Sequence, residues 1–144
     1  MKKLLSLFLI ISSASLMSGC ATGPKYSQVK ASIPVLAPDN GRIYFYRTAV
    51  MGAAIQPSVK LNDQVVGTAK PGGFFYVDRP AGDYKVETST EVKRELSLTL
   101  DKGQSRYVRL DISLGFFAGH VYPVLVDDAT GESEIGSCSY TGSK

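Results

Sequence analysis

The sequence predicts an all-β domain, built as an antiparallel β-sandwich or a partly open barrel of about seven to nine short strands. After residue 20, no stretch shows the sustained 3.6-residue apolar period of a helix. Short apolar and aromatic runs are instead separated at regular intervals by Gly, Pro, Asn and Asp, which are typical turn residues. Of the 144 residues, 44% are hydrophobic and 20% are charged, so the chain is globular and long enough for one domain.

Residues 1–19 are expected to be a signal peptide that is removed on export. Lys2 and Lys3 precede the apolar run Leu4–Ile11, and small residues follow it, which is the order of a secretory signal. The apolar run is shorter than the ~20 residues that a membrane-spanning helix needs. The sequence therefore predicts export rather than a permanent transmembrane helix.

Met17-Ser18-Gly19-Cys20 resembles the bacterial lipobox, in which small residues precede a cysteine that is acylated and becomes the new N-terminus. The lipobox pattern prefers Leu where Met17 stands, and an ordinary signal peptide cut after Ala21 is the alternative. Several acyl chains, palmitate among them, would anchor Cys20 stably in a lipid bilayer, at ~0.8 kcal/mol per buried methylene. Ala21 is not Asp, which under the enteric-type sorting rule favours the outer membrane, with the domain facing the periplasm.

Residues 20–40 are expected to comprise the lipidated Cys20 and a flexible tether. Pro24, Pro34 and Pro38 interrupt this segment, and no apolar period runs through it. A flexible chain of this length spans ~25 Å on average, which would hold the domain away from the membrane surface. A first strand near residues 33–36 is the alternative.

The strands are expected in a domain that spans residues 41–144. Asn62-Asp63 suits a tight hairpin, because both residues tolerate positive φ. Leu96, Leu98 and Leu100 alternate with polar residues, which gives one buried and one exposed face. Pro123 places the last long strand at an edge or a bulge. The expected strands are residues 43–46, 57–61, 64–69, 74–78, 83–90, 96–100, 105–112 and 121–126.

Three charged segments are expected to connect these strands. Glu91–Glu95 is predicted to be a charged loop, and Asp101-Lys102-Gly103 a hairpin-type connection with Gly103 at positive φ. Residues 127–134 carry four carboxylates around a Thr130-Gly131 turn, and oxygen ligands at this density could hold calcium. Their order does not fit an EF-hand loop, so solvated carboxylates at a hairpin tip are the ordinary explanation.

Several of these strands resemble the domain-of-unknown-function 2846 family, which occurs in small bacterial lipoproteins. Gly41–Arg47 looks like that family's opening strand, Val59–Gly67 is similar to its second hairpin, and Gly73–Val86 matches its pattern best. Tyr107-Val108-Arg109 follows at a suitable distance, so the resemblance covers about residues 40–125. The Pro-x-Gly-x-Tyr-x-Val motif that begins at Pro80 also looks like PEGA-type and transthyretin-like β-sandwich modules. The resemblance implies a sandwich fold and no established activity, cofactor or catalytic residue.

Catalytic and metal-binding patterns are not found in the sequence. His120 is the only histidine, whereas a zinc site needs three or four ligands. A triad at His120 would need a nucleophile and an orienting acid; Asp111 and several serines exist, but no Gly-x-Ser-x-Gly motif is present. We therefore expect no catalytic residue, no metal and no cofactor, with a hydrolase that uses His120 as the less favoured alternative.

Cys138 is the thiol that remains once Cys20 is acylated, so no disulfide can form within the chain. Three states are open to Cys138: buried as a small hydrophobic residue, exposed and free, or bridged to another chain.

Two aromatic pairs raise the question of a binding surface. Adjacent residues of a strand point to opposite faces, so Phe74 and Phe75 cannot share one core, and neither can Phe116 and Phe117. Exposed aromatic side chains could stack on sugars or dock a protein, which makes Phe116, Phe117 and His120 the expected partner contact. The alternative is that the tether or the 114–119 loop covers them.

The charge balance further limits the possible functions. The formal net charge is +3, but two of the 16 basic residues are Lys2 and Lys3, so the exported chain would carry 14 basic against 13 acidic side chains. Scattered charge and an envelope location disfavour nucleic acid as a partner. The sequence therefore predicts an outer-membrane lipoprotein whose β-sandwich is a non-enzymatic binding or accessory module for an envelope protein or polysaccharide. A lipid-tethered structural stabiliser of an envelope complex is the alternative.

Overall fold

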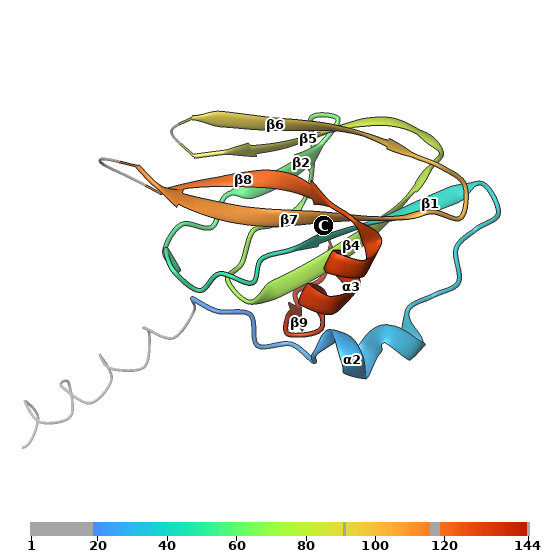
Figure 1. The fold of residues 1–144 in the computed structure, drawn as a ribbon, viewed down its shortest axis with the longest axis horizontal. Helices are drawn as coiled ribbons and strands as arrows, with labels where there is room; N and C mark the ends of the chain where they lie inside the picture. Colours follow the sequence, from blue (N-terminus) through green and yellow to red (C-terminus); the bar gives the residue numbers. More distant parts are fainter. Residues whose placement is uncertain (1–18, 91, 116–118, 144) are drawn as a thin grey trace, which may run out of the picture.

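The computed structural model describes residues 19–90, 92–115 and 119–143 (Figure 1). Within them, no helix is long and apolar enough to cross a membrane. The helical elements are α2 (Tyr26–Val29), the 3₁₀ turn η2 (Lys30–Ser32) and α3 (Asp128–Ile135). The strands are β1 (Asn40–Tyr46), β2 (Ser58–Leu61), β3 (Gln64–Thr68), β4 (Gly73–Pro80), β5 (Gly82–Ser89), β6 (Lys93–Leu100), β7 (Ser105–Leu114), β8 (Gly119–Val126) and β9 (Ser139–Tyr140).

These strands form two packed sheets, which confirms the predicted all-β sandwich. The larger sheet has the order β8-β7-β1-β4-β9, and the smaller has the order β3-β2-β5-β6. Most neighbours are antiparallel, but β1 pairs with β7, and β4 with β9, in parallel. The strand with Pro123 is β8, at the edge of the larger sheet, as the proline predicts.

The aromatic run in β1 is buried on both faces of the larger sheet. Ile43 and Phe45 point into the core between the sheets, where Phe45 stacks on Phe75 with ring centroids 5.0 Å apart. Tyr44 and Tyr46 point to the outer face and join a second apolar cluster. A two-sided burial of this kind explains why β1 is continuously apolar and does not alternate. The members of the second cluster are Tyr26, Tyr44, Tyr46, Phe74, Tyr107, Ile135 and Cys138.

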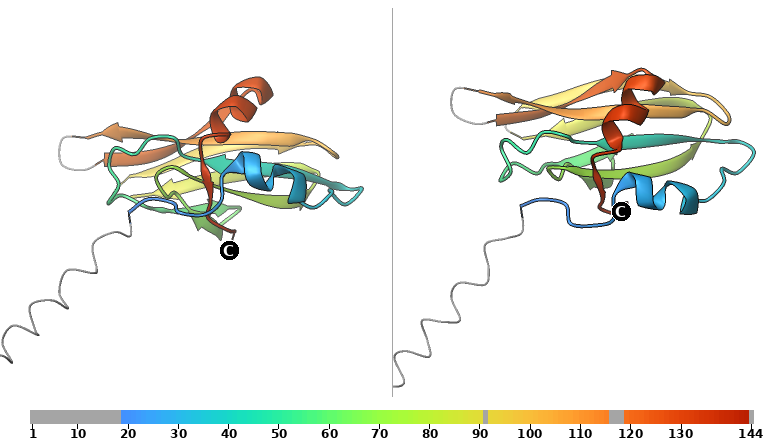
Figure 2. Two further views of the ribbon diagram at one scale, coloured as in Figure 1. Left: turned by 90° about the horizontal axis from the view of Figure 1, so that it is seen from below. Right: turned by 60° about the horizontal axis from the view of Figure 1, so that its bottom comes forward.

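The N-terminal segment differs from the flexible tether that the sequence predicts. α2 packs on the outer face of the larger sheet together with α3 (Figures 1 and 2). Tyr26 is buried there, edge-on to the rings of Tyr44 and Phe74, and its backbone N–H donates to the Cys138 carbonyl at 3.0 Å. Burying such a side chain contributes about 2 kcal/mol, which helps to offset the entropy of ordering the segment. No strand forms near residues 33–36 either.

The carboxylate-rich stretch at 127–134 is a helix, which corrects the predicted hairpin tip. Asp127 caps α3, since its side chain accepts a hydrogen bond from the Thr130 N–H at 2.9 Å. Eight residues make only a little more than two turns, too short for an apolar period to be recognised. No group of three or more metal ligands occurs in the described parts of the chain, so calcium finds no support there.

The turns behave largely as their residues predict. Asn62 and Asp63 both have positive φ, 47° and 67°, and close the β2–β3 hairpin. Gly103 has a φ of 71°, as expected, but the connection that contains it joins β6 in one sheet to β7 in the other and is not a hairpin. The charged loop predicted over residues 91–95 is wrong for its second half, because β6 begins at Lys93.

Candidate functional site

The directions of the strands place four of the connections between them at one end of the sandwich, which we call the Cys20 end. β1 and β7 are parallel and both end there, while β4 and β8 begin there. In the smaller sheet β3 and β5 end there, and β2 and β6 begin there. We define the Cys20 end as Cys20, the described residues of these connections (47–57, 69–72, 90, 92 and 115) and the adjoining strand ends Leu114 and Gly119; it lies at the left in Figure 1.

Cys20 is exposed, and the chain is fixed to the domain on either side of it. The Ala21 N–H donates to the Pro71 carbonyl at 3.0 Å. The Gln56 side-chain amide donates to the Gly19 carbonyl at 2.7 Å and to that of Ala53 at 2.8 Å. Cys20 therefore lies between the β1–β2 loop and the β3–β4 turn, with no free chain between it and the domain.

Arg47 organises this end from inside. Its side chain is fully buried and forms no ion pair with a carboxylate of the described residues; instead, its guanidinium donates to four backbone carbonyls. Three of these belong to the β1–β2 loop, and the fourth, from Ala69, precedes the β3–β4 turn. Burial lowers the pKa of Arg47. The bonds, of 2.6 to 3.1 Å, tie together the two segments that flank Cys20.

Apolar side chains project into solvent at the Cys20 end. Val50 and Met51, in the β1–β2 loop, are 64% and 55% exposed. Leu114, at the end of β7, is 67% exposed, and Val92 is 44% exposed. Gly52, at a φ of +67°, lets this loop lie against Ile112, since an added Cβ would come within 2.3 Å of that side chain.

His120 lies at the start of β8, and the structure gives it no catalytic partner among the described residues. Its Nδ1 is 3.1 Å from the Thr90 hydroxyl. Ser113 is its cross-strand neighbour in the register, but no hydrogen bond joins the two side chains. The Asp111 carboxylate is instead held by Arg109, at 2.7 and 3.0 Å. The other two residues of the expected partner contact, at positions 116 and 117, lie outside the described residues.

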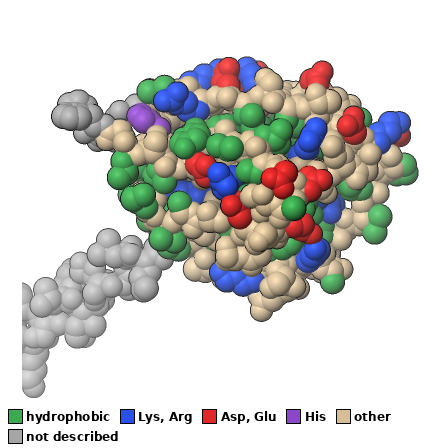
Figure 3. All heavy atoms as spheres, in the orientation of Figure 1, with side chains coloured by type: hydrophobic (Ala, Val, Ile, Leu, Met, Phe, Trp, Pro, Cys, Tyr) green, Lys and Arg blue, Asp and Glu red, His purple; other side chains and the backbone are tan. Residues whose placement is uncertain are grey.

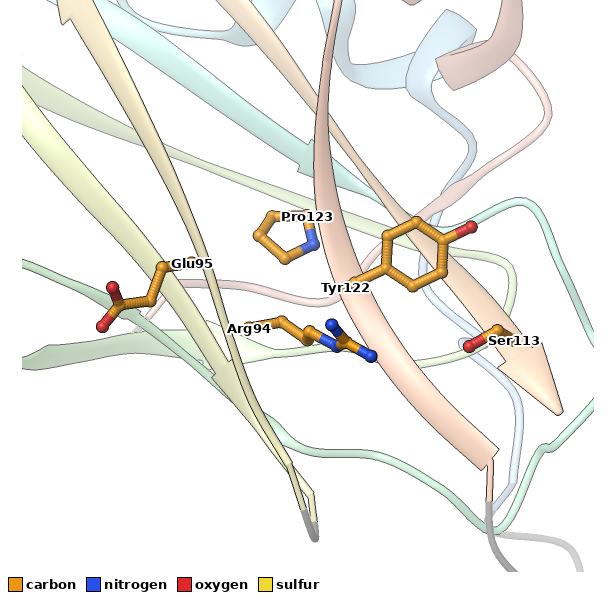
Figure 4. Close-up of a pocket in the computed structure, with 5 residues that line it drawn as sticks. All are labelled: Arg94, Glu95, Ser113, Tyr122 and Pro123. Carbon is orange, nitrogen blue, oxygen red and sulfur yellow. The ribbon is translucent and has the colours of Figure 1, made fainter. Parts of the chain in front are cut away.

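A groove of about 350 Å³ lies between the edge strands β6 and β8 (Figure 4). Arg94 reaches from β6 toward Tyr122 and Ser113, whereas Glu95 points away from them (Figure 4). Pro123 completes the lining. A cation beside a phenol and a hydroxyl is suited to polar or anionic groups of a partner. No local sequence pattern indicates this groove, because it forms between strands of different sheets.

The carboxylates predicted at a hairpin tip hold α3 on the larger sheet. Glu132 accepts hydrogen bonds from the hydroxyls of Tyr26 and Tyr107, at 3.0 and 3.2 Å. It also pairs with Lys30, whose ammonium lowers the pKa of Glu132. Glu134 accepts from the Tyr46 hydroxyl at 2.6 Å. These glutamates therefore have a structural role on the outer face.

Cys138 adopts the first of the three states considered for it. Its side chain is fully buried, with Sγ 3.8 Å from the Arg47 carbonyl, and burial raises the pKa of its thiol. The thiol is therefore neither exposed nor placed to bridge to another chain.

Residues 37–122 match the family described as "Protein of unknown function (DUF2846)". The chain belongs to this family. The match begins before β1 and ends within β8, so the DUF2846 region contains both sheets apart from β9 and the end of β8. It leaves Cys20, α2 and α3 outside. The chain is also similar to an uncharacterized protein of Haemophilus influenzae, at 28% identity over 139 residues, which is 93% of this chain and 83% of the relative.

Proposed function

We propose that this DUF2846 protein is an outer-membrane lipoprotein, acylated at Cys20, whose periplasmic sandwich is a non-enzymatic binding or accessory module for an envelope protein or polysaccharide. The observation that carries the anchor is the position of Cys20, exposed at one end of the sandwich directly after a segment that resembles a lipobox. A modified cysteine needs this exposure, because a buried one could not place acyl chains in a membrane.

The contacts around Cys20 are compatible with cleavage before it. Cutting the Gly19–Cys20 bond would remove the contact from Gln56 to the Gly19 carbonyl. The bond from the Ala21 N–H to Pro71 would remain, and so would that from Gln56 to Ala53. The mature N-terminus therefore keeps its place on the domain after processing.

The anchor is tested with a pair of cysteine variants. Cys20→Ala should abolish labelling by radioactive palmitate and release the protein from the membrane fraction. Cys138→Ala is the matched control, because it removes the buried cysteine and should leave both labelling and fractionation unchanged. Membrane association of Cys20→Ala equal to that of the unmodified sequence would contradict the lipid anchor.

The binding role is supported by the groove between β6 and β8, which is open to solvent and carries the guanidinium of Arg94. A photo-crosslinking residue in place of Tyr122 should capture an envelope component in living cells. The same residue in place of Ser97, which is exposed on β6 outside the groove, is the control. Equal capture from both positions, or none from position 122, would count against the groove as the contact surface.

A further inference from the structure

The Cys20 end has the features of a surface that lies on a membrane in a defined orientation. We propose, on the basis of the proposed lipid anchor at Cys20, that this end is itself a lipid-contacting surface. Val50, Met51, Val92 and Leu114 enter the interface of the bilayer that holds the acyl chains, and the sandwich stands upright on it.

The chain leaves no slack between the anchor and the domain. Ala21, one residue after Cys20, is already bonded to Pro71 at 3.0 Å. Adjacent Cα atoms are about 3.8 Å apart, so acyl chains on Cys20 bring the Cys20 end to the depth of the headgroups. A domain on a long flexible tether could tumble away from the membrane, whereas this arrangement does not allow it.

The surface that is brought to the membrane is apolar. Val50, Met51, Val92 and Leu114 come from three different connections and are all between 44% and 67% exposed. Other exposed large hydrophobic side chains in the described residues lie elsewhere, with Val35 in the segment that leads to the far end of β1. Apolar side chains that reach the boundary between headgroups and acyl chains lose contact with water, which stabilises the bound orientation.

Acidic residues are distributed unevenly between the two ends of the sandwich. None of the described residues of the Cys20 end is Asp or Glu, although Glu91, outside those residues, belongs to the β5–β6 connection. The basic Arg94 lies beside that connection, and its neighbour Lys93 is paired with Glu87 and Glu95. The exposed aspartates of the opposite end are Asp39, Asp63, Asp83, Asp101, Asp127 and Asp128.

The same polarity is visible on the surface. On the face shown in Figure 3, the left-hand edge carries hydrophobic side chains and no acidic ones, whereas acidic side chains lie among further hydrophobic ones from the centre to the right. Anionic headgroups attract basic residues and repel aspartates, so the molecule has one end suited to a lipid surface and one suited to water.

The lipid-facing loop is also held rigid. The buried Arg47 binds the carbonyls of Met51 and Gly52 at 2.8 and 3.1 Å, so the loop that bears Val50 and Met51 is fixed before it meets lipid. A surface that is already ordered loses less conformational entropy on binding than a flexible loop would.

Tryptophan scanning tests this orientation, since the chain has no tryptophan of its own. Met51→Trp and Leu114→Trp report on the Cys20 end, and Val35→Trp, at a position 96% exposed, is the matched control. Each variant is purified as the full lipoprotein and reconstituted into vesicles of phosphatidylethanolamine and phosphatidylglycerol, with or without dibromophosphatidylcholine. The bromines quench a tryptophan only within the acyl region.

We expect the tryptophans introduced at positions 51 and 114 to lose about half of their emission in brominated vesicles and to shift to the blue, while the one at position 35 changes little. Protein that sediments with the vesicles but shows no more quenching at position 51 or 114 than at position 35 would contradict the proposed orientation and leave the anchor intact. The same outcome would be expected if a second copy of the chain, instead of lipid, covered the Cys20 end in the vesicles. Protein that does not sediment with the vesicles would contradict the lipid anchor itself, and the orientation with it.

Discussion

Replacing the buried Arg47 is predicted to destabilise the whole domain. Arg47→Met keeps an apolar stem but loses the guanidinium and with it every donor. In the unmodified protein, Arg47 donates hydrogen bonds to four carbonyls. Three of these bonds are partly buried, and the bond to the Ala69 carbonyl is fully buried. Each lost bond of the first kind costs about 1 kcal/mol, and an unsatisfied buried carbonyl costs about 2 kcal/mol.

Removing the desolvated charge of Arg47, which has no counter-ion among the described residues, acts in the opposite direction and stabilises the fold by about 1–2 kcal/mol. The net loss in the free energy of unfolding is therefore about 3–4 kcal/mol. With an m-value of about 2 kcal/mol/M, the midpoint of urea denaturation should fall by about 2 M. Arg47→Lys, which keeps a charge and three donors, should lose about half as much.

Urea denaturation followed by far-UV circular dichroism measures these losses. Arg94→Met, at an exposed position, is the control and should shift the free energy of unfolding by less than about 0.5 kcal/mol. A loss below about 1 kcal/mol in Arg47→Met would refute the reasoning, because the four carbonyls would then be satisfied without the guanidinium.

Three further predictions concern stability. Lys93, 2.5 Å from Glu87, lowers the pKa of Glu87 from its usual 4.5 to about 2. The stability that this pair contributes is therefore present above pH 4.5 and is lost as the pH falls toward 2. Glu87→Gln should flatten the curve of stability against pH in that window, and an unchanged curve would contradict the pairing. Tyr26→Ala should cost about 3 kcal/mol in denaturant unfolding and Tyr26→Phe about 1, whereas equal costs would mean that the bond to Glu132, and not the ring, holds α2 in place. Asp127→Ala should cost about 1 kcal/mol through loss of the α3 cap, and Asp127→Asn, which can still accept the bond, should recover most of it in the same assay.

The sheets could be predicted from the sequence because their signals are local. Turn residues such as Asn62 and Asp63 need only tolerate positive φ, and the leucines of β6 need only alternate. The opposite orientation of Phe74 and Phe75 was also predictable, and both are buried because α2 covers the outer face on which Phe74 lies. The division of the strands between two sheets and the parallel pairing of β1 with β7 depend on long-range packing, which no local sequence pattern indicates.

The packing of α2 and α3 on the outer face of the larger sheet could not be predicted, because it too depends on long-range contacts. α2 is a single turn that exists because Tyr26 finds an aromatic pocket, and α3 lies on the sheet because Glu132 and Glu134 meet tyrosine hydroxyls. In the sequence, those side chains look like a polar tether and a solvated acidic turn. The role of Arg47 could not be predicted either. Its guanidinium binds backbone carbonyls, which every residue has, so no particular residue type in the sequence marks its partners.

The packing of the N-terminal segment on the larger sheet also determines how far the protein can reach from a membrane. A flexible tether would let one domain sample partners within a radius of ~25 Å around its anchor. With the N-terminal segment packed on the larger sheet, reach is set by the sandwich itself, and the ten residues of β7 span about 33 Å. An upright domain would therefore present its aspartate-bearing end at a fixed height. The groove between β6 and β8 would lie close to the membrane surface, because Arg94 and Ser113, which line it, stand within two residues of Val92 and Leu114. Such a protein would meet only those partners that present a matching surface at that height. A Gly/Ser insert between Cys20 and Ala21 would free the domain from its fixed height. It should therefore weaken crosslinking from position 122 while leaving the lipid anchor intact.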